Sequence, residues 1–215
     1  MLNDKIANLR KEYKMKILVE EEIHSNPFDQ FKLWWQEAIN SSVDEINAMT
    51  LATCDVDGKP SARIVLLKDI TNEGFTFFTN YESRKANQLT HNDSAALVFF
   101  WSALERQIRI EGVVSKIEEN TSNAYFKTRP LGSQIGAWAS PQSKIIPNRS
   151  WLELQEQQTM KKFSQIEIPK PPYWGGYIVK PTLIEFWQGR PNRLHDRIQY
   201  TLQRNQLWRI ERLAP

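Results

Sequence analysis

The stretch AMTLATCDVDGKPSARIVLLKDITNEGFTFFT, residues 48–79, indicates a β fold because it alternates runs of β-forming residues with turn segments. The turn segments, Asp57-Gly58 and Asn72-Glu73-Gly74, are of the kind that joins the strands of a hairpin. The pattern continues downstream, and the predicted strands cover residues 48–54, 61–68, 75–79, 95–101 and 106–117. Short connections predict an antiparallel meander, and the aliphatic and aromatic content predicts that it curls into a barrel.

Helices are predicted on both sides of this region. A short polar helix begins after Asp4, with one face formed by Ile6, Leu9 and Tyr13. A second begins after Asn26, which suits an N-cap, with one apolar face formed by Phe28, Phe31, Trp35 and Ile39. Further helices are expected at residues 121–128, 133–138 and 148 to about 165, the last amphipathic, and further strands at 176–179, 183–187, 197–202 and 207–213, with a hairpin turn at 204–206. The predicted fold class is mainly β with flanking helices (α+β).

The composition excludes several classes of protein. The 215 residues suffice for one domain with a substantial core, and a formal net charge of +3 does not argue for nucleic-acid binding. Cys54 has no cysteine to pair with, the N-terminus lacks an apolar stretch of the signal-peptide type, and the longest apolar run, residues 95–101, is far shorter than the roughly 20 residues that span a bilayer. Only three histidines occur, and no metal-ligand spacing appears. We therefore expect a cytoplasmic protein without a metal site, a membrane segment or a nucleic-acid partner.

Cationic side chains within apolar segments are the features that need a functional explanation. Arg63 and Lys68 bracket four aliphatic residues and, being five positions apart, point to opposite faces of a regular strand. They can serve one small ligand only if a bulge intervenes or if the ligand lies past the end of the strand. The alternative is that both are solvated ends of a core strand.

A second cationic group opens a predicted helix. Ser83 suits the N-cap of a helix over residues 84–90, whose first turn then contains Arg84 and Lys85. Because a helix N-terminus already favours anions, two added cations suit a phosphate. Two solvated surface cations would give the same pattern.

A third group lies in the next helical region. Tyr125 and Arg129 are four positions apart and share one helix face, and Ser133 follows Pro130. A phenol, a guanidinium and a hydroxyl can converge on a second phosphate. A tyrosine that covers an arginine stem on a surface helix is the alternative.

The fourth group is the segment Arg193-Leu194-His195-Asp196-Arg197. On an extended segment the two arginines and His195 lie on one side, while Leu194 and Asp196 face the other. Two guanidiniums around an imidazole lower the pKa of the histidine and favour its neutral form, which can accept a proton or a hydrogen bond. The alternative is a basic hairpin in which Asp196 neutralises a neighbour.

Glu185-Phe186-Trp187-Gln188, four further residues and then residues 193–197 resemble the signature of the pyridoxamine 5'-phosphate oxidases. Residues 63–68, 83–85, 104–107, 129–130 with 133–138, and 212–215 are similar to the same family in the same order, so the resemblance covers about residues 9–215. It implies an FMN-binding split antiparallel β-barrel that works as a homodimer with FMN at the subunit interface. It also implies an N-terminal helix and mobile lid over residues 1–25 and a single domain over 26–215, with dimerisation and active-site residues from about 170 to 215.

The resemblance also assigns residues by position. FMN would be bound by Arg63, Ile64, Val65, Leu66, Leu67, Lys68, Phe78, Thr79, Arg84, Lys85, Gln107, Gln142, Ser143, Trp187 and Arg197. Substrate would be bound by Arg10, Lys11, Glu12, Tyr13, Lys68, Tyr125, Arg129, Ser133, Arg193, Leu194 and His195. Arg193 and His195 would be the catalytic residues, lying against the pyridine ring and the reacting amine, and residues 10–13 would act as a lid.

The implied reaction is the FMN-dependent oxidation of pyridoxamine 5'-phosphate and pyridoxine 5'-phosphate by O2. It gives pyridoxal 5'-phosphate and H2O2, with ammonia from the amine, in vitamin B6 biosynthesis or salvage. A flavin is needed because no side chain can accept the two electrons. The alternatives are another split-barrel flavin reductase, against which the C-terminal signature argues, and a non-catalytic protein that binds FMN or pyridoxal phosphate, which could dispense with Arg193 and His195.

Overall fold

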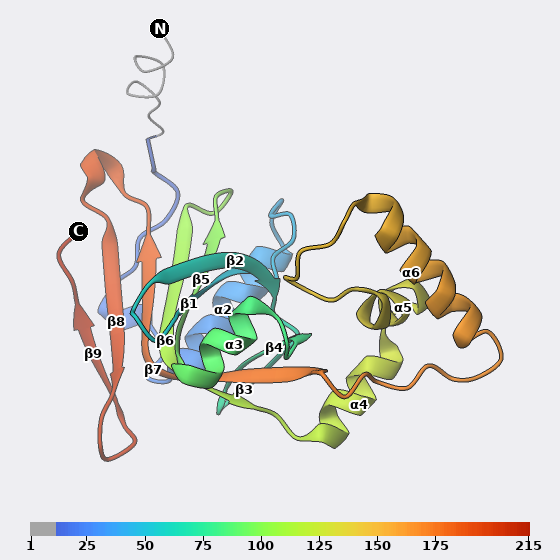
Figure 1. The fold of residues 1–215 in the computed structure, drawn as a ribbon. Coiled ribbons are helices and arrows are strands. Elements are labelled where there is room, and N and C mark those ends of the chain that lie inside the picture. Colours follow the sequence, from blue (N-terminus) through green and yellow to red (C-terminus); the bar gives the residue numbers. More distant parts are fainter. Residues whose placement is uncertain (1–11) are drawn as a thin grey trace, which may run out of the picture. The chain divides into compact units, whose positions relative to one another are not determined.

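The computed structural model describes residues 12–215, which divide into two compact units. Unit 1 consists of the residues up to Met49, Leu97–Ile110 and Thr182–Pro215, and unit 2 consists of Thr50–Ala96 and Glu111–Pro181. Each unit therefore combines segments that are far apart in the sequence. Figure 1 labels the helices and strands along the chain.

Within the described residues nine strands form one sheet, in the order β2-β1-β5-β6-β7-β4-β3, with β8 paired to β7 and β9. The strands are β1 (Ala48–Cys54), β2 (Pro60–Leu66), β3 (Asp69–Thr71), β4 (Gly74–Asn80), β5 (Ser94–Trp101), β6 (Arg106–Lys116), β7 (Trp174–Gln188), β8 (Asp196–Leu202) and β9 (Trp208–Arg212). All five strands predicted from residues 48–117 are present, but the predicted meander order is wrong. A helix separates β4 from β5, so no hairpin joins them, and β4 pairs instead with β7, Phe75 opposite Val179.

Strand β7 corrects a second expectation, since two predicted strands at 176–179 and 183–187 are one strand of 15 residues. Residues 174–179 pair with β4 and residues 183–188 pair with β8. Pro181, which has no N–H to donate, falls in the gap between these two pairings and so does not interrupt the strand.

The helices are α2 (Pro27–Ile39), α3 (Arg84–His91), α4 (Glu119–Thr128), α5 (Leu131–Ala139) and α6 (Arg149–Lys162), with 3-10 turns η1 (Glu20–Glu22) and η2 (Pro191–Arg193). The two predicted N-caps are confirmed, because the side chains of Asn26 and Ser83 accept hydrogen bonds from backbone N–H groups of α2 and α3. The predicted first helix is wrong at Tyr13, which is in no helix, and its residues up to 11 lie outside the described ones.

The core of unit 1 lies between α2 and the strands. The buried face of α2 contains Phe28 and Phe31 as expected, but it continues through Trp34 and Ala38, whereas Ile39 is half exposed. The predicted face is therefore right over the first turn of α2 and shifted by one residue in its second half, where Trp34 and Ala38 are buried instead of Trp35 and Ile39. The ring of Trp34 lies 5.1 Å from that of Phe186 on β7.

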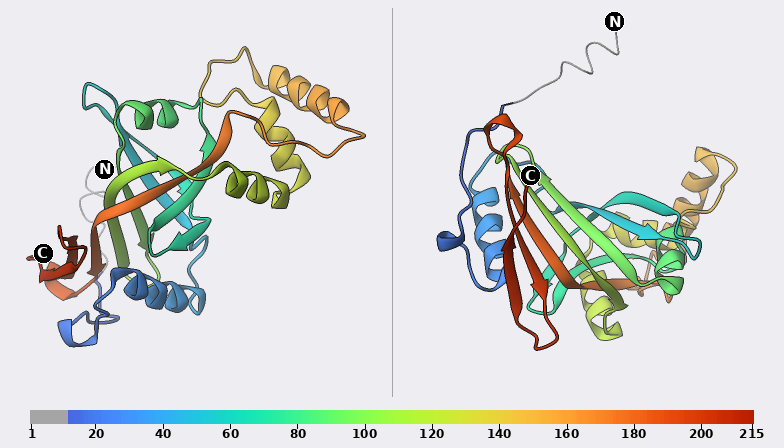
Figure 2. Two further views of the ribbon diagram at one scale, coloured as in Figure 1. Left: turned by 90° about the horizontal axis from the view of Figure 1, so that it is seen from below. Right: turned by 90° about the vertical axis from the view of Figure 1, so that its left-hand side faces the viewer.

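The C-terminal hairpin belongs to the same unit. Strands β8 and β9 are joined by a turn at the predicted residues, closed by a hydrogen bond from Gln203 N to Leu207 O of 2.9 Å. In Figure 2 this hairpin (red) lies beside α2 (blue), and the rings of Phe28 and Trp208 are 6.4 Å apart.

The core of unit 2 has two parts. Phe77 on β4 packs 5.7 Å from Tyr177 on β7. A second buried cluster combines residues of α4 and α5 with residues after α6 and at the start of β7, namely Phe126, Ile135, Phe163, Ile168 and Trp174. Helix α6, predicted to be amphipathic, buries none of its residues. Among the described residues, no helix has the length and apolar character needed to cross a membrane.

Candidate active site

Unit 2 contains a cavity of about 850 Å³ between β2, β4 and the helices α3 to α5. It is lined by Arg63, Ile64, Val65, Leu66, Lys68, Phe78, Thr79, Asn80, Lys85, Tyr125, Thr128, Arg129, Pro130, Ser133, Gly136, Ala137, Ser140, Gln142 and Trp174. Four of these residues carry a positive charge, and none of the described residues that line the cavity is Asp or Glu.

Lys68 shows how two cations of one segment reach the same cavity. Strand β2 ends at Leu66 and the short strand β3 begins at Asp69, so Lys68 lies past the strand end rather than within the predicted strand of residues 61–68. The alternation of side chains that would set Arg63 and Lys68 on opposite faces therefore does not extend to Lys68. Both residues line the cavity.

Arg63 is held in place by neutral oxygen atoms. Its guanidinium donates to Thr53 Oγ1 at 2.7 Å, Leu51 O at 3.0 Å and Ser61 Oγ at 2.6 Å. Burial lowers the pKa of Arg63, and the positive charge of Arg84 lowers it further. The charge is thus placed firmly in the cavity without a carboxylate to neutralise it.

Lys85, in the first turn of α3, has a similar environment. Its ammonium group is buried and donates to Thr79 Oγ1 at 2.9 Å, Ser83 Oγ at 3.3 Å and Gln142 Oε1 at 3.2 Å. Burial lowers the pKa of Lys85 to about 8, and the charge of Arg63 adds to the effect. The N-terminus of α3 is also positive, so this corner of the cavity favours an anion for two reasons.

Arg129 follows α4 and lies against an aromatic surface. Its guanidinium is 4.7 Å from the ring of Trp174, and its Nη1 is buried without a hydrogen-bond partner among the described residues. Tyr125 and Phe78 continue this surface, with ring centroids 3.9 Å apart and planes inclined by 21°. A buried guanidinium nitrogen with no acceptor is costly, and a phosphate oxygen would satisfy it.

The cavity can therefore bind anionic ligands. Two cationic centres are available: Arg63 and Lys85 near the N-terminus of α3, and Arg129 beside Tyr125 and Ser133. A planar ring of a ligand can stack on the aromatic surface that lines the same cavity.

A second group of predicted residues lies in unit 1. The ring of His195 is 4.6 Å from that of Trp187 and 6.0 Å from that of Tyr13. The Nδ1 atom of His195 accepts a hydrogen bond of 3.1 Å from the backbone N–H of Arg190. In the neutral ring the hydrogen is therefore on Nε2, so His195 has an N–H to donate, whereas the sequence suggested a general acceptor.

The pKa of His195 is lowered, as the sequence predicted, but mainly for another reason. Burial is the largest cause, the positive charge of Arg193 is the second, and Asp196 opposes both. The predicted extended segment is wrong, because Arg193 belongs to η2 with φ of 62° and β8 begins only at Asp196. The turn contains Pro191 and Asn192, the latter also with positive φ, and this breaks the alternation of sides.

Arg197 is fixed by a buried acid. Its guanidinium donates to Glu185 Oε1 at 2.7 Å and Oε2 at 3.1 Å, and Arg109 donates to the same carboxylate at 3.0 Å. Hydrogen bonding to Glu185 raises the pKa of Arg197. Asp196 does neutralise neighbours, since it pairs with Arg212 at 2.9 Å and Arg190 at 3.5 Å, so this part of the alternative interpretation is confirmed.

The structure brings together most of the predicted cofactor and phosphate residues. The predicted residues that line the cavity are Arg63, Ile64, Val65, Leu66, Lys68, Phe78, Thr79, Lys85, Gln142, Tyr125, Arg129 and Ser133. Leu67 is buried in the core, and Arg84 and Ser143 are exposed beside lining residues. Gln107, Trp187, Arg193, Leu194, His195 and Arg197 belong to unit 1, as do Glu12, which is exposed, and Tyr13. Arg10 and Lys11 lie outside the described residues.

Sequence reasoning missed several residues of these sites. Trp174 lines the cavity but follows a proline-rich loop that gave no functional signal. Glu185 was part of the quoted signature, yet its role as the partner of Arg197 was not foreseen, although a lone acid within an apolar strand is a signal of a buried ion pair.

Comparison with known proteins finds the family that the sequence motifs resemble, and the matches extend along nearly the whole chain. Residues 35–161 match the family model described as pyridoxamine 5'-phosphate oxidase, and residues 174–215 match the one described as the pyridoxine 5'-phosphate oxidase C-terminal dimerisation region. A pyridoxine/pyridoxamine 5'-phosphate oxidase of Cyanothece sp. is 55% identical over 210 residues, 98% of both chains.

Solved structures show the same fold. PhzG from Burkholderia lata 383, in complex with tetrahydrophenazine-1-carboxylic acid, has a TM-score of 0.88 and 28% identity, covering 94% of this chain and 99% of that one. A pyridoxamine 5'-phosphate oxidase-related, FMN-binding protein of Nostoc punctiforme has a TM-score of 0.70 and 17% identity, covering 88% and 98%. The predicted fold class, mainly β with flanking helices in the split-barrel arrangement, is thereby confirmed. The chain belongs to the pyridoxamine 5'-phosphate oxidase family.

Proposed function

We propose that the protein oxidises pyridoxamine 5'-phosphate and pyridoxine 5'-phosphate to pyridoxal 5'-phosphate, with FMN as cofactor and O2 as electron acceptor. H2O2 is the second product, and ammonia is released from the amine. The names of relatives that match the chain from end to end support the reaction. The observation that carries the proposal is the cavity of unit 2, which has four cationic side chains and no acidic one among its described lining residues.

FMN and the substrate each carry a phosphate, and the cavity has a cationic centre for each. Arg63 and Lys85, with Arg84 beside them, fit the phosphate of FMN, because their mutual repulsion is relieved when a dianion binds. Gln142 and Thr79 bind Lys85 and would hold it toward that phosphate.

The second centre fits the phosphate of the substrate. Arg129 has a buried nitrogen without an acceptor among the described residues, and Ser133 and Tyr125 supply hydroxyl groups that line the same cavity. Lys68 also lines it and can bind either phosphate. Holding the substrate by its phosphate fixes the position of the carbon to be oxidised, which is a large part of catalysis.

FMN, when bound, would supply the two-electron acceptor that no side chain provides. For the residues of unit 1 the proposal follows the family resemblance. His195 would donate its Nε2 hydrogen to the substrate, and Arg193 would add a positive charge beside the pyridine ring. Gln107, Trp187 and Arg197 would contact the flavin, and Leu194 and residues 10–13 the substrate.

We also propose a homodimer with FMN at its interface, because residues 174–215 match a dimerisation region by name. We likewise propose that residues 1–25 form an N-terminal lid and that residues 26–215 form one domain. We also propose a cytoplasmic location.

The test is an oxidase assay on the purified protein. The visible spectrum should show bound flavin, and pyridoxamine 5'-phosphate added in air should yield aldehyde and peroxide in equal amounts. If the protein were colourless and added FMN restored neither a flavin spectrum nor activity, the proposal would be overturned. A yellow protein that binds the substrate but forms neither product would be a binding protein, and one that reduces its flavin only with a nicotinamide would be a reductase.

A further inference from the structure

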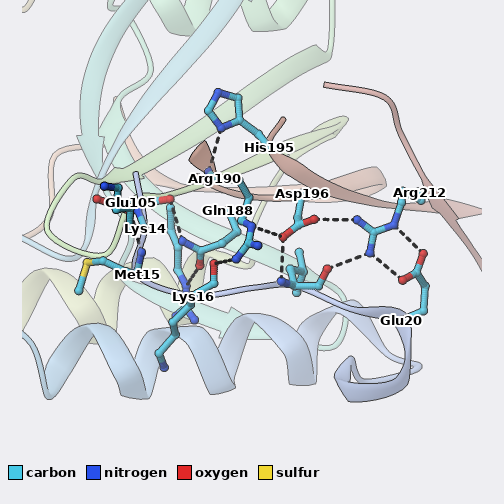
Figure 3. A network of polar contacts seen from close by, with 12 residues as sticks. Lys14, Met15, Lys16, Glu20, Glu105, Gln188, Arg190, His195, Asp196 and Arg212 are labelled. Carbon is cyan, nitrogen blue, oxygen red and sulfur yellow. Dashed lines mark hydrogen bonds and ion pairs between the residues drawn. The ribbon is translucent and has the colours of Figure 1, made fainter. Parts of the chain in front are cut away.

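Residues 13–20, which we call the N-terminal strap, are held by side chains of unit 1 although only the last of them, Glu20, belongs to a regular element, η1. The backbone N–H groups of Lys14 and Met15 both donate to Oε2 of Glu105, at 2.8 and 3.1 Å (Figure 3). One carboxylate oxygen thus binds two successive peptide groups. Hydrogen bonds of this kind, with a charged acceptor, are among the stronger ones in proteins.

The far end of the strap is bound to Asp196, which follows His195, and to Arg212 at the end of β9. Leu18 N donates to Asp196 Oδ2 at 3.1 Å, and Arg212 donates to Leu18 O at 2.9 Å and pairs with Glu20 (Figure 3). The backbone of the strap is therefore fixed at both ends.

Glu105 is also joined to the loop before His195. The residue is buried and has φ of 55°, and its carbonyl oxygen accepts hydrogen bonds from Gly189 N at 2.7 Å and Gln188 Nε2 at 3.2 Å. Its side chain thus binds the strap while its backbone binds the start of the loop that leads to His195.

Tyr13 is the strap residue that gains a defined position. Its ring is edge-on to Trp187 at 5.8 Å and lies 6.0 Å from His195. Gly189 leaves space for it, since a Cβ there would be 2.7 Å from Tyr13 Cγ. The two peptide groups bound by Glu105 come directly after Tyr13 in the chain, so they limit where its ring can lie.

We infer that Glu105 is a positioning residue, which sets Tyr13 against Trp187 and His195 by binding the peptide N–H groups of Lys14 and Met15. The inference rests on the proposed function, because it makes substrate binding depend on this carboxylate. Glu105 acts only through the strap and does not itself contact substrate or cofactor.

The decisive variant is Glu105→Gly, because glycine adopts φ of 55° without strain and the carbonyl bonds of residue 105 are kept. Glu45→Gly is a matched control, since Glu45 also has positive φ, at 44°, and its side chain is exposed. Glu105→Gln, which keeps an acceptor oxygen but no charge, should give an intermediate result.

Two readouts are needed. Amide hydrogen exchange at Lys14 and Met15 should become about tenfold faster or more in Glu105→Gly than in the control, because the charged acceptor is lost. The KM for pyridoxamine 5'-phosphate should rise by about tenfold, with FMN content and kcat much less affected. In a Tyr13→Ala background the further rise in KM caused by Glu105→Gly should nearly vanish.

Each outcome decides the inference. Unchanged exchange at Lys14 and Met15 would show that Glu105 does not hold the strap. Faster exchange with an unchanged KM, or an equal rise in KM with and without Tyr13, would show that the bond does not position Tyr13 for substrate. If the wild-type protein lacked oxidase activity, the proposed function would fail by itself, and a calorimetric Kd for pyridoxamine 5'-phosphate would take the place of KM in the same comparison.

Discussion

Two sets of buried or partly buried cations, one in each unit, differ in what they contact. In unit 1 the guanidinium of Arg197 is paired with the buried carboxylate of Glu185. In unit 2 the ammonium of Lys85 contacts only hydroxyl and amide oxygens in the bonds described above, those of Thr79, Ser83 and Gln142. The same contrast separates Arg106, which is buried and pairs with Glu37 in unit 1, from the partly buried Arg63 and Arg129 in unit 2.

The difference shows which cations serve the fold and which serve a ligand. A buried cation paired with a carboxylate is neutralised within the protein, so removing it leaves an uncompensated acid. A buried cation with neutral partners has lost its hydration without gaining a counter-charge, and a bound anion supplies that charge. Replacing cations of the two kinds should therefore change the free energy of unfolding in opposite directions.

The largest effect is expected in unit 1 for Arg106→Met. Arg106 is buried, pairs with Glu37, donates to Gln188 at 2.9 Å and lies 4.1 Å from the ring of Trp34. We expect the free energy of unfolding to fall by about 3 kcal/mol in urea titrations. Lys32→Met, which breaks an exposed pair with Asp29, should cost less than about 0.5 kcal/mol. A loss below about 1 kcal/mol in Arg106→Met would contradict the distinction.

The next effect is expected in unit 2 for Arg129→Met. The KM for pyridoxamine 5'-phosphate should rise about 10- to 100-fold, because a charged hydrogen bond to the phosphate is lost. The ligand-free variant should be at least as stable as the wild type, since a buried nitrogen without an acceptor has been removed. Steady-state kinetics and urea titration measure the two quantities, with the exposed Arg149→Met as control. Reduced stability together with an unchanged KM would place Arg129 among the structural cations.

A smaller effect, with a clear pH dependence, is expected for FMN binding through Lys85. Its pKa is lowered to about 8, so below pH 8 the charge is present and attracts the phosphate, and above pH 8 it is progressively lost. FMN affinity should fall by about tenfold as the pH rises through this range, while the ligand-free protein gains stability as the pH rises from 8 toward 10.5, where the unfolded state still binds the proton. In Lys85→Met the affinity should be low and flat over the same pH range. The exposed Lys59→Met is the control, and an equally steep fall in both variants would assign the titration to another group.

The smallest effect concerns the acid limb of activity. Burial lowers the pKa of His195 below its ordinary value of 6.5, so the neutral ring predominates at pH 7. The value of kcat/KM should still exceed half of its maximum at pH 6.5 and should decline as the pH falls further, because protonation of Nδ1 removes the bond to Arg190. The dependence of kcat/KM on pH measures this limb. A midpoint above 6.5 would show that His195 does not control it.

Local chemistry made much of the fold and the cavity predictable. Asn26 and Ser83 predicted where α2 and α3 begin, because an N-cap depends on the side chain next to the free N–H groups of the helix. Turn residues and alternation placed the strands from residue 48 to 117, and a helix N-terminus with two adjacent cations indicated the anion site at Lys85.

What could not be predicted depends on contacts distant in sequence. The pairing of β4 with β7 joins residues about a hundred positions apart, and no local pattern encodes that choice. The turn at Arg193 and the carboxylates of Glu105 and Glu185 acquire their roles only when the strap, the loop and β7 are placed together. Predictions from alternation therefore failed where tertiary contacts impose a turn.

A crystal structure of the protein with FMN and pyridoxal 5'-phosphate would show whether the cations of unit 2 bind the ligands, because it locates both phosphates. We expect the FMN phosphate within about 3 Å of the charged nitrogens of Arg63 and Lys85, and the other phosphate at the same distance from Arg129 and the hydroxyl of Ser133. Phosphates bound elsewhere, with these cations still contacting only neutral protein atoms, would show that the cations do not serve a ligand.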